Sequence, residues 1–329
     1  MGVSPLAALQ ARAKLKEAVR AFFGARAYLE VDTPLAVVCP GTEVHLRYFP
    51  TEWLDYQGRT QRLYLRSSPE LHMKQTLALG AERIFQLAPC FRSGGEYSQW
   101  HHPEFTMLEW YECGLSFSGL IDQTEELLRF SHKYMGSRLV LPKQFARISV
   151  AEAFKRWVGL DLIDGDQELA KKGTAAGAVS LRDDDDFETA FFKLLIERVE
   201  PGMAALGGAV LMDYPASQAA LAQVVGGVAK RFEFYFGRVE LCNGFDELLG
   251  AAANQMRLSE SNRRRTEYGY EVPGIDAGFT AALNKGIKPC SGNALGFDRW
   301  LALLLGLDHI ASVIPFRDSA CYASAKGSD

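Results

Sequence analysis

Apolar and polar residues alternate along several short stretches of the chain, and this period-two pattern predicts β-strands. Two stretches, Ile84 to Phe91 and Phe105 to Tyr111, are separated by a loop of hairpin length. A third runs from 28 to 34, where a proline that cannot donate a ladder hydrogen bond ends it, so an edge or interface position follows. Other strands are expected at 63–66, 209–212, 231–236 and 239–244, the last two joined by a tight turn at Gly237-Arg238.

Helical periodicity appears in separate parts of the sequence. Helices are predicted at 1–23, from Ser68-Pro69-Glu70 through Leu77, at 119–135, at 187–199 and at 300–305. Residues 150–205 give a weaker signal and are interpreted as an insertion or cap. The acidic run within it, 183–186, suits a solvated loop or helix start, with metal binding as the alternative. Strands joined by hairpins and helices grouped elsewhere indicate an α+β fold with an antiparallel sheet, in one domain over 1–329.

Composition narrows the class of protein. The 329 residues are 48% hydrophobic and 23% charged, with no uncharged apolar stretch of the roughly 20 residues that span a membrane. The first helix carries charges throughout and lacks the apolar segment of a signal peptide, so we expect a cytoplasmic protein. Six scattered cysteines argue against a zinc site or a disulfide framework. A net charge of −4 lacks the basic excess of proteins that wrap nucleic acid.

The first hairpin carries candidate chemistry. Arg92 follows its first strand, and a guanidinium fork can bind a carboxylate and a phosphate oxygen together while they react. On the second strand Phe105, Met107 and Glu109 share one face, which could offer a ring to a base and a carboxylate to a substrate. Either half alone also fits a surface hairpin with ordinary charges. Together they predict an adenylate-forming site.

A second hairpin carries two acids. Glu233 and Glu240 lie seven residues apart across the turn, so we expect them to face each other. Their repulsion would be relieved by Mg²⁺ bound to triphosphate oxygens; the alternative is two exposed glutamates on a solvated face. Asn243 and Glu247 follow, and a bend at Gly244 could turn both toward an amino acid.

Near the C-terminus, small residues lead into an apolar helix. The run from Ser291 to Arg299 can place a guanidinium on a terminal phosphate, with Gly296 permitting close backbone approach. The alternative is a packed helix entry without a ligand.

Taken together, these segments resemble the class II aminoacyl-tRNA synthetase catalytic domain, in particular the lysine-type enzymes, from about residue 10 to 317. Tyr28 to Pro34 resembles motif 1, the dimer-interface motif; Phe91 to Tyr111 resembles motif 2; Ala294 to Arg299 resembles motif 3. The three occur in the family's order. The resemblance implies a homodimer that binds ATP, Mg²⁺ and lysine.

The resemblance also implies a role for each candidate residue. Arg92 would bind the α-phosphate and the substrate carboxylate, Phe105 would stack on adenine, and Arg299 would hold the γ-phosphate. The implied ligand sets are Arg92, Glu96, His101, His102, Phe105 and Arg299 for ATP; Glu233 and Glu240 for Mg²⁺; and Glu70 (α-amine), Asn243 (carboxylate), Glu109, Tyr111 and Glu247 (distal ammonium) with Ala294 for the amino acid.

Two features resemble one branch of the family. About 27 residues precede motif 1, too few for the anticodon-binding barrel of lysyl-tRNA synthetases. Ala294 stands where synthetases commonly have glycine, and its methyl group could retune the pocket or be neutral packing. Both are similar to the truncated paralogues that activate (R)-β-lysine and join it to a lysine of translation elongation factor P. By that resemblance tRNA is not the expected acceptor.

Other features depart from the family pattern. The motif 2 loop has an apparent extra residue and places Glu96 four positions after Arg92, while His101-His102-Pro103 replaces His-Asn-Pro. Residues 248–253 are apolar or small where the family is polar. A synthetase core that charges tRNA and a silent lysine- or adenylate-binding regulator therefore remain alternatives. Arg263-Arg264-Arg265 is the candidate basic patch for an acidic acceptor, or else a solvated helix face.

Overall fold

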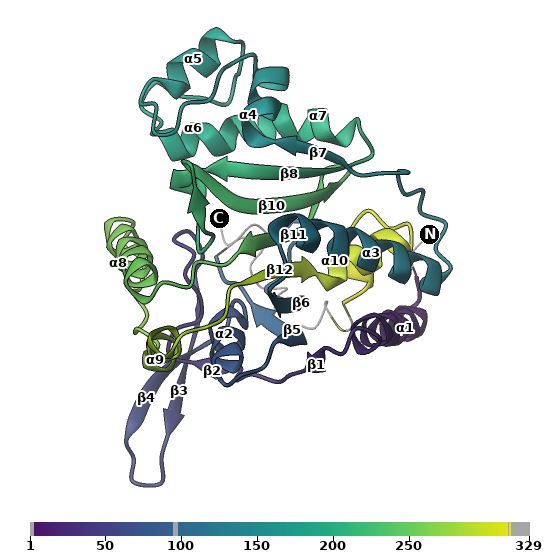
Figure 1. The fold of residues 1–329 in the computed structure, drawn as a ribbon, viewed down its shortest axis with the longest axis vertical. Helices are drawn as coiled ribbons and strands as arrows, with labels where there is room; N and C mark the ends of the chain where they lie inside the picture. Colours follow the sequence, from purple (N-terminus) through teal and green to yellow (C-terminus); the bar gives the residue numbers. More distant parts are fainter. Residues whose placement is uncertain (1–2, 95–97, 315, 317–329) are drawn as a thin grey trace, which may run out of the picture.

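A computed structural model describes residues 3–94, 98–314 and 316. One large sheet crosses the molecule in the order β1-β5-β6-β12-β11-β10-β8-β7, with β9 beside β10 (Figure 1). The β1–β5 and β7–β8 pairs are parallel and the other pairs are antiparallel, as the α+β prediction requires. The strands are β1 (Leu29–Glu30), β5 (Arg83–Phe91), β6 (Glu104–Cys113), β12 (Cys290–Gly296), β11 (Val239–Asp246), β10 (Val228–Phe236), β9 (Val224–Val225), β8 (Gly208–Pro215) and β7 (Ala146–Ser149).

One face of this sheet is covered by helices α1 (Pro5–Gly24), α3 (Phe117–Met135) and α10 (Phe297–Leu304) (Figure 1). Trp110 of β6 and Phe232 of β10 point into this layer and are fully buried there. Because successive strand residues point to opposite faces, residues 109 and 233 point to the other face. The main core therefore occupies this face, and the polar residues of the predicted site lie on the other.

A second, three-stranded sheet stands beside the first in the order β2-β4-β3. Its β3–β4 hairpin projects from the body of the molecule (Figure 1). Helices α2, α8 and α9 lie next to it around a small apolar cluster that includes Leu71 and Phe279. These elements are β2 (Ala36–Val37), β3 (Phe49–Leu54), β4 (Thr60–Leu65), α2 (Glu70–Ala78), α8 (Ala251–Glu267) and α9 (Ala277–Lys285).

The weakly patterned stretch 150–205 forms a helical layer over the β7–β8–β10 end of the sheet (Figure 1). It has its own core, in which the rings of Phe154 and Phe191 stack 5.2 Å apart. Asp186 caps a helix by accepting the amide of Thr189 at 2.8 Å, so the acidic run is a helix start. In the described part of the chain, no group of three or more His, Cys, Asp or Glu could hold a metal. The elements are α4 (Val150–Ala153), α5 (Leu169–Ala175), α6 (Phe187–Leu194), α7 (Glu200–Ala204) and the π-turns Phe154–Val158 and Leu195–Val199.

Two predicted boundaries are wrong, and one predicted helix differs in its geometry. The strand expected over 28–34 is only the two-residue edge strand β1, because the Arg66 guanidinium binds the carbonyl oxygens of Thr33 and Pro34. The helix expected over 187–199 changes to π geometry after Leu194. The last long helix begins at Phe297, three residues earlier than expected. Short 3₁₀ turns, Ala216–Gln218 and Ile310–Ser312, complete the described elements.

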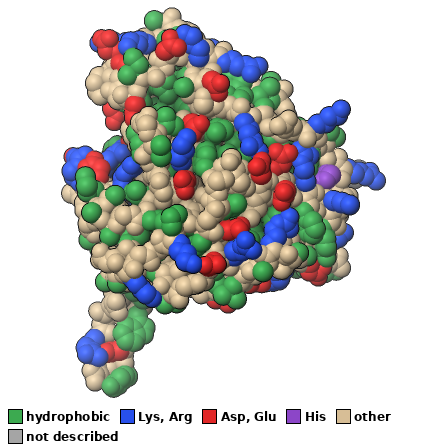
Figure 2. Space-filling model, in the orientation of Figure 1, with side chains coloured by type: hydrophobic (Ala, Val, Ile, Leu, Met, Phe, Trp, Pro, Cys, Tyr) green, Lys and Arg blue, Asp and Glu red, His purple; other side chains and the backbone are tan. Residues whose placement is uncertain are grey.

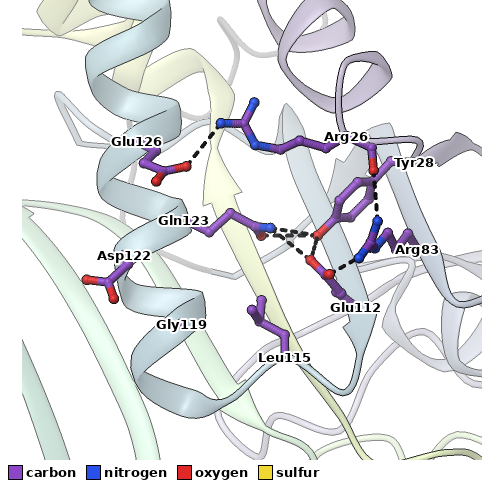
Figure 3. Close-up of a pocket in the computed structure, with 9 residues that line it drawn as sticks. All are labelled: Arg26, Tyr28, Arg83, Glu112, Leu115, Gly119, Asp122, Gln123 and Glu126. Carbon is purple, nitrogen blue, oxygen red and sulfur yellow. Dashed lines mark hydrogen bonds and ion pairs between the residues drawn. The ribbon is translucent and has the colours of Figure 1, made fainter.

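A pocket of about 310 Å³ opens on the helix-covered side, between α3 and the β5–β6 edge (Figure 3). The Tyr28 hydroxyl donates to Glu112 at 2.5 Å, and Gln123 donates to both of these side chains. Arg83 pairs with the other oxygen of Glu112 at 2.8 Å. This closed polar network joins motif 1 to motif 2 on the face opposite the predicted site. Among the described helices, none is both long and apolar enough to cross a membrane.

Candidate active site

A row of polar side chains crosses the open face of the large sheet. Glu233, Asn243, Ala294, Glu109 and Gln86 are successive cross-strand partners on β10, β11, β12, β6 and β5. Direct cross-strand partners point to the same face. The structure therefore brings four of the predicted site residues into one row, although they come from three distant parts of the sequence.

A β-bulge aims two of the predicted ligands. Tyr235 pairs with Glu240 and Phe234 with Cys242, so β11 has one extra residue, Leu241. Glu240 and Asn243 are three residues apart and would point to opposite faces of a regular strand; the extra residue lets both point to the site. The expectation that Glu240 directly faces Glu233 is wrong, because the two-residue turn pairs Glu240 with Tyr235, and Glu233 lies opposite Asn243.

The predicted bend at Gly244 is also wrong. This glycine lies in regular β11 pairing, and the ring of Phe232 occupies the space that a Cβ would need. Asn243 and Glu247 reach the same face because they are four residues apart on an extended backbone. The amide of Glu247 continues the pairing by donating to the Cys290 carbonyl at 3.0 Å.

Glu109 is almost completely buried, at 1% exposure. It accepts hydrogen bonds from the Ser68 hydroxyl at 2.7 Å and the Tyr111 hydroxyl at 3.2 Å. Burial raises the pKa of Glu109 to about 8, and the charge of Glu70 adds to the increase. An empty pocket at neutral pH therefore favours a protonated Glu109, and a nearby ammonium group would favour its ionised form.

Close packing sets the shape of this end of the pocket. Gly292 of β12 has no room for a side chain. The Tyr111 ring and Oε1 of Glu247 occupy the space that a Cβ atom would need. Tyr111 and Gly292 are cross-strand partners. The tyrosine and the glutamate predicted to meet the distal ammonium thus lie together.

Lys74 is a site residue that the sequence reasoning missed. It is fully buried on α2, and its ammonium pairs with Glu70 at 2.7 Å and Glu247 at 2.6 Å. Burial raises the pKa of Glu247 to about 7, and the Lys74 charge opposes the increase. The available signal was the four-residue spacing from Glu70 on a predicted helix.

Asn243 presents an unsatisfied polar atom to the site. Its buried Oδ1 accepts no hydrogen bond from any described residue. A half turn of the amide would exchange this oxygen for the NH₂ group, so the side chain can serve either an acceptor or a donor. The side chain suits a polar ligand above Ala294, its partner on the next strand.

At the other end, Arg92 follows β5 and lies 5.3 Å above the Phe105 ring. Its guanidinium is 3.6 Å from the Glu43 carboxylate, and its buried Nε has no described hydrogen-bond partner. Both observations fit a cation that has capacity for an anionic ligand. Because Arg92 covers the ring, a base could stack on Phe105 only beside the guanidinium or after it moves.

Arg299 lies at the start of α10 beside the motif 2 loop. It donates to the carbonyls of Trp100 at 3.2 Å and Glu240 at 2.8 Å, and contacts the His101 ring at 2.9 Å. His101 and Arg299 are thus brought together as predicted for the ATP site. His102 is buried, with its ring bonded to the Glu104 backbone, and Glu96 lies outside the described residues.

The buried carboxylate of Asp298 connects the start of α10, in motif 3, to strand β6, in motif 2. Asp298 accepts the Thr106 amide of β6 at 2.6 Å and pairs with Arg12 of α1, which also bonds the Thr106 hydroxyl. The start of α10 is therefore fixed to the strand that carries Phe105 and Glu109. Sequence analysis did not identify either Asp298 or Arg12.

The two predicted metal ligands differ in environment. Glu233 accepts from Tyr214 at 2.6 Å and Tyr235 at 2.7 Å and pairs with Arg231 at 2.6 Å. The side chain of Glu240 is 40% exposed and is thus only partly hydrated. This loss of hydration is the larger cause of its raised pKa, and the negative charge of Glu233 is the second. A cation would relieve this repulsion. Both oxygens of Glu233 already have protein partners, so Glu240 is the carboxylate with capacity for Mg²⁺, and such an ion would be coordinated mainly by phosphates and water.

The candidate basic patch on α8 does not form. Arg265 is 2% exposed and donates to backbone carbonyls of residues 43–46. Arg264 pairs with Glu188 of the 150–205 layer, and Arg263 pairs with two glutamates of its own helix. On the face shown in Figure 2, basic and acidic side chains are interspersed. Pairing and burial thus remove the run as a source of free positive charge.

The fold and the site together identify the class of protein. A mostly antiparallel sheet carries the row of polar side chains, with Arg92 and Arg299 beside it. Residues 4–319 match the family described as tRNA synthetases class II (D, K and N), and the chain belongs to this family. Within it, the chain is similar to proteins named "Elongation factor P--(R)-beta-lysine ligase". The Hamiltonella defensa protein is 36% identical over 95% of both chains, that of Vibrio cholerae 37% over 96% of this chain and 97% of its own, and that of Photobacterium profundum 38% over 94% of both.

Proposed function

We propose that this protein is an ATP-dependent ligase that activates (R)-β-lysine, or lysine, as an adenylate and transfers it to a lysine side chain of translation elongation factor P. The observation that carries the proposal is the 36–38% identity, over nearly the whole chain, to relatives that bear this ligase name. The site supports it, because buried carboxylates surround the predicted amino-acid pocket and two arginines, Arg92 and Arg299, lie at the predicted ATP site.

In the first step, an oxygen of the substrate carboxylate attacks the α-phosphorus of ATP. The new C(=O)–O–P bond forms as the bond to the β-phosphate breaks, giving an aminoacyl-adenylate and pyrophosphate. Arg92 would bind the α-phosphate and the carboxylate, and Arg299 the terminal phosphate. Mg²⁺, held with Glu240 and Glu233, would neutralise phosphate charge. Positioning and electrostatic stabilisation then supply most of the rate.

Recognition of a diamino acid follows from acids at both ends of the amino-acid pocket. Glu70 would accept the amine nearer the carboxylate, and Asn243 would bind the carboxylate itself. Glu109, Tyr111 and Glu247 would bind the distal ammonium. An amino acid without that group would offer no cation to the buried Glu109 and to the second oxygen of Glu247, which disfavours neutral substrates.

In the second step, a neutral amine of the acceptor lysine attacks the carbonyl carbon of the adenylate. An amide bond forms, AMP leaves with the electrons of the C–O bond, and the amine loses a proton. The acceptor would approach from the open side of the row.

We further propose that residues 1–329 act as one catalytic domain, in a cytoplasmic homodimer. The short edge strand β1 lies in the motif that forms the dimer interface of class II enzymes, which supports the proposal. Sedimentation equilibrium of the purified protein would show a mass twice that of the 36.4 kDa chain. A monomer at micromolar concentration would contradict this part of the proposal.

The function is tested by competition. Purified protein is given ATP, Mg²⁺ and labelled (R)-β-lysine or lysine, together with both elongation factor P and tRNA. Label on the protein acceptor, with (R)-β-lysine preferred, is expected. Label on tRNA would instead establish a tRNA-charging core. Adenylate without transfer would refute elongation factor P as the acceptor, and no adenylate at all would favour a binding regulator.

A further inference from the structure

Lys74 lies between the two acids that are predicted to bind the two amines of the substrate. Its ammonium pairs with Glu70, the acid predicted to bind one amine of the substrate, and with Glu247, predicted to bind the other. The side chain is fully buried, so it cannot exchange these partners for water. Buried lysines are rare unless paired, and this one has two partners of the same site.

The ammonium uses one oxygen of each carboxylate. It contacts Oε1 of Glu70 and Oε2 of Glu247, while Oε1 of Glu247 faces Gly292 and Tyr111. Each acid thus retains a second oxygen for a ligand. Two anions joined by one cation also repel each other less than two unpaired anions would.

The framework on either side of the ammonium is stiff. Lys74 and Glu70 are four residues apart on α2, so the helix fixes their separation. Glu247 ends the β11 pairing, where its amide bonds the Cys290 carbonyl. The backbones of the two acids are therefore held by α2 and β11, and the shared ammonium sets how far apart their carboxylate groups lie.

We infer that Lys74 is a specificity-determining positioning residue, which sets the spacing between the two amine-binding acids and so selects the length of the diamino acid. The inference rests on the proposed function, because it concerns the amino-acid pocket of that reaction. It predicts that Lys74 acts on the choice among diamino acids more than on ATP.

The test compares adenylate formation by ATP–pyrophosphate exchange with (R)-β-lysine, lysine and ornithine, which is one methylene shorter. Lys74→Met keeps an unbranched side chain that reaches as far as the lysine Cε and removes the ammonium group. We expect the preference for the two lysines over ornithine, in kcat/KM, to fall by about tenfold or more, with KM for ATP within about twofold of wild type. Arg265→Met, which removes a buried cation on α8, is the control and should leave the preference unchanged.

Lys74→Arg covers the case in which the methionine variant does not fold. It keeps both carboxylates paired with a cation, but the planar fork holds them in a different geometry. The preference should again change while the melting temperature stays close to wild type. Wild-type preference in either folded variant would overturn the inference. Wild-type protein that exchanges pyrophosphate with none of the three acids would instead overturn the proposed function.

Discussion

The buried carboxyl group of Glu109 links the stability of the protein to recognition of its substrate. Burial raises its pKa to about 8 from the usual 4.5. At pH 7 the group is therefore protonated in the folded protein and ionised in the unfolded chain. Its contribution to stability is fully present below pH 4.5 and is lost as the pH rises toward 8.

The magnitude follows from the pKa difference. A pH of 7 lies about 2.5 units above the pKa of this group in the unfolded chain, and each unit corresponds to about 1.4 kcal/mol. The raised pKa therefore lowers the free energy of unfolding at pH 7 by about 3 kcal/mol. Glutamine has the same size and is always neutral. We expect the free energy of unfolding of Glu109→Gln to exceed that of wild type by about 3 kcal/mol at pH 7. Near pH 4.5 the two proteins should be equally stable.

Urea unfolding at pH 4.5, 6, 7 and 8.5 measures this difference. The control is Glu104→Gln, an exposed glutamate at the start of the same strand, which should stay within about 0.5 kcal/mol of wild type at every pH. A Glu109→Gln variant that is no more stable at pH 7, or whose difference from wild type does not change with pH, would refute the reasoning.

The same carboxyl group predicts a proton released on binding. A substrate ammonium beside Glu109 favours the ionised form, so lysine binding at pH 7 should release close to one proton. Calorimetry in two buffers with different ionisation enthalpies would detect it. Glu109→Gln should bind lysine more weakly and release no proton from this site. Heats that do not depend on the buffer in wild type would contradict the pocket as described.

Three further predictions concern other parts of the site. Arg92→Ala should abolish ATP–pyrophosphate exchange, and near-normal exchange would rule out its role at the α-phosphate. Gly292→Ala would place a methyl group against the Tyr111 ring, so KM for the amino acid should rise at least tenfold with KM for ATP unchanged. An equal rise in both KM values would contradict the position of Gly292 in the amino-acid pocket. Removing Mg²⁺ with EDTA should stop exchange, and Glu240→Gln should raise the Mg²⁺ concentration needed to restore it; an unchanged requirement would exclude Glu240 as a ligand.

The departures from the family pattern have a local structural account. Residues 248–253 lead into α8, and buried Asn254 donates to the carbonyls of Leu248 at 2.6 Å and Gly250 at 3.1 Å. Leu249 packs in an apolar cluster with Tyr111. This stretch, which follows Glu247 directly, is thus held by hydrogen bonds from Asn254 and by apolar packing of Leu249.

The sequence by itself determined the local features of the fold and site. Alternation placed Phe105, Met107 and Glu109 on one face of a strand, and that face carries the site in the structure. The order of the three motifs indicated the family, and the match over 4–319 confirms it. These inferences depend on side-chain periodicity and turn chemistry, which act over a few residues.

Only the tertiary structure decided how the distant segments meet. The extra residue in β11 depends on hydrogen bonding to β10, and it alone brings Glu240 to the same face as Asn243. Lys74 appeared as an ordinary helical lysine until the fold placed Glu247 beside it. Arg265 appeared as a surface charge until its helix packed against residues 43–46. Register, ion pairing and burial depend on contacts between segments far apart in the chain, and local sequence patterns do not encode them.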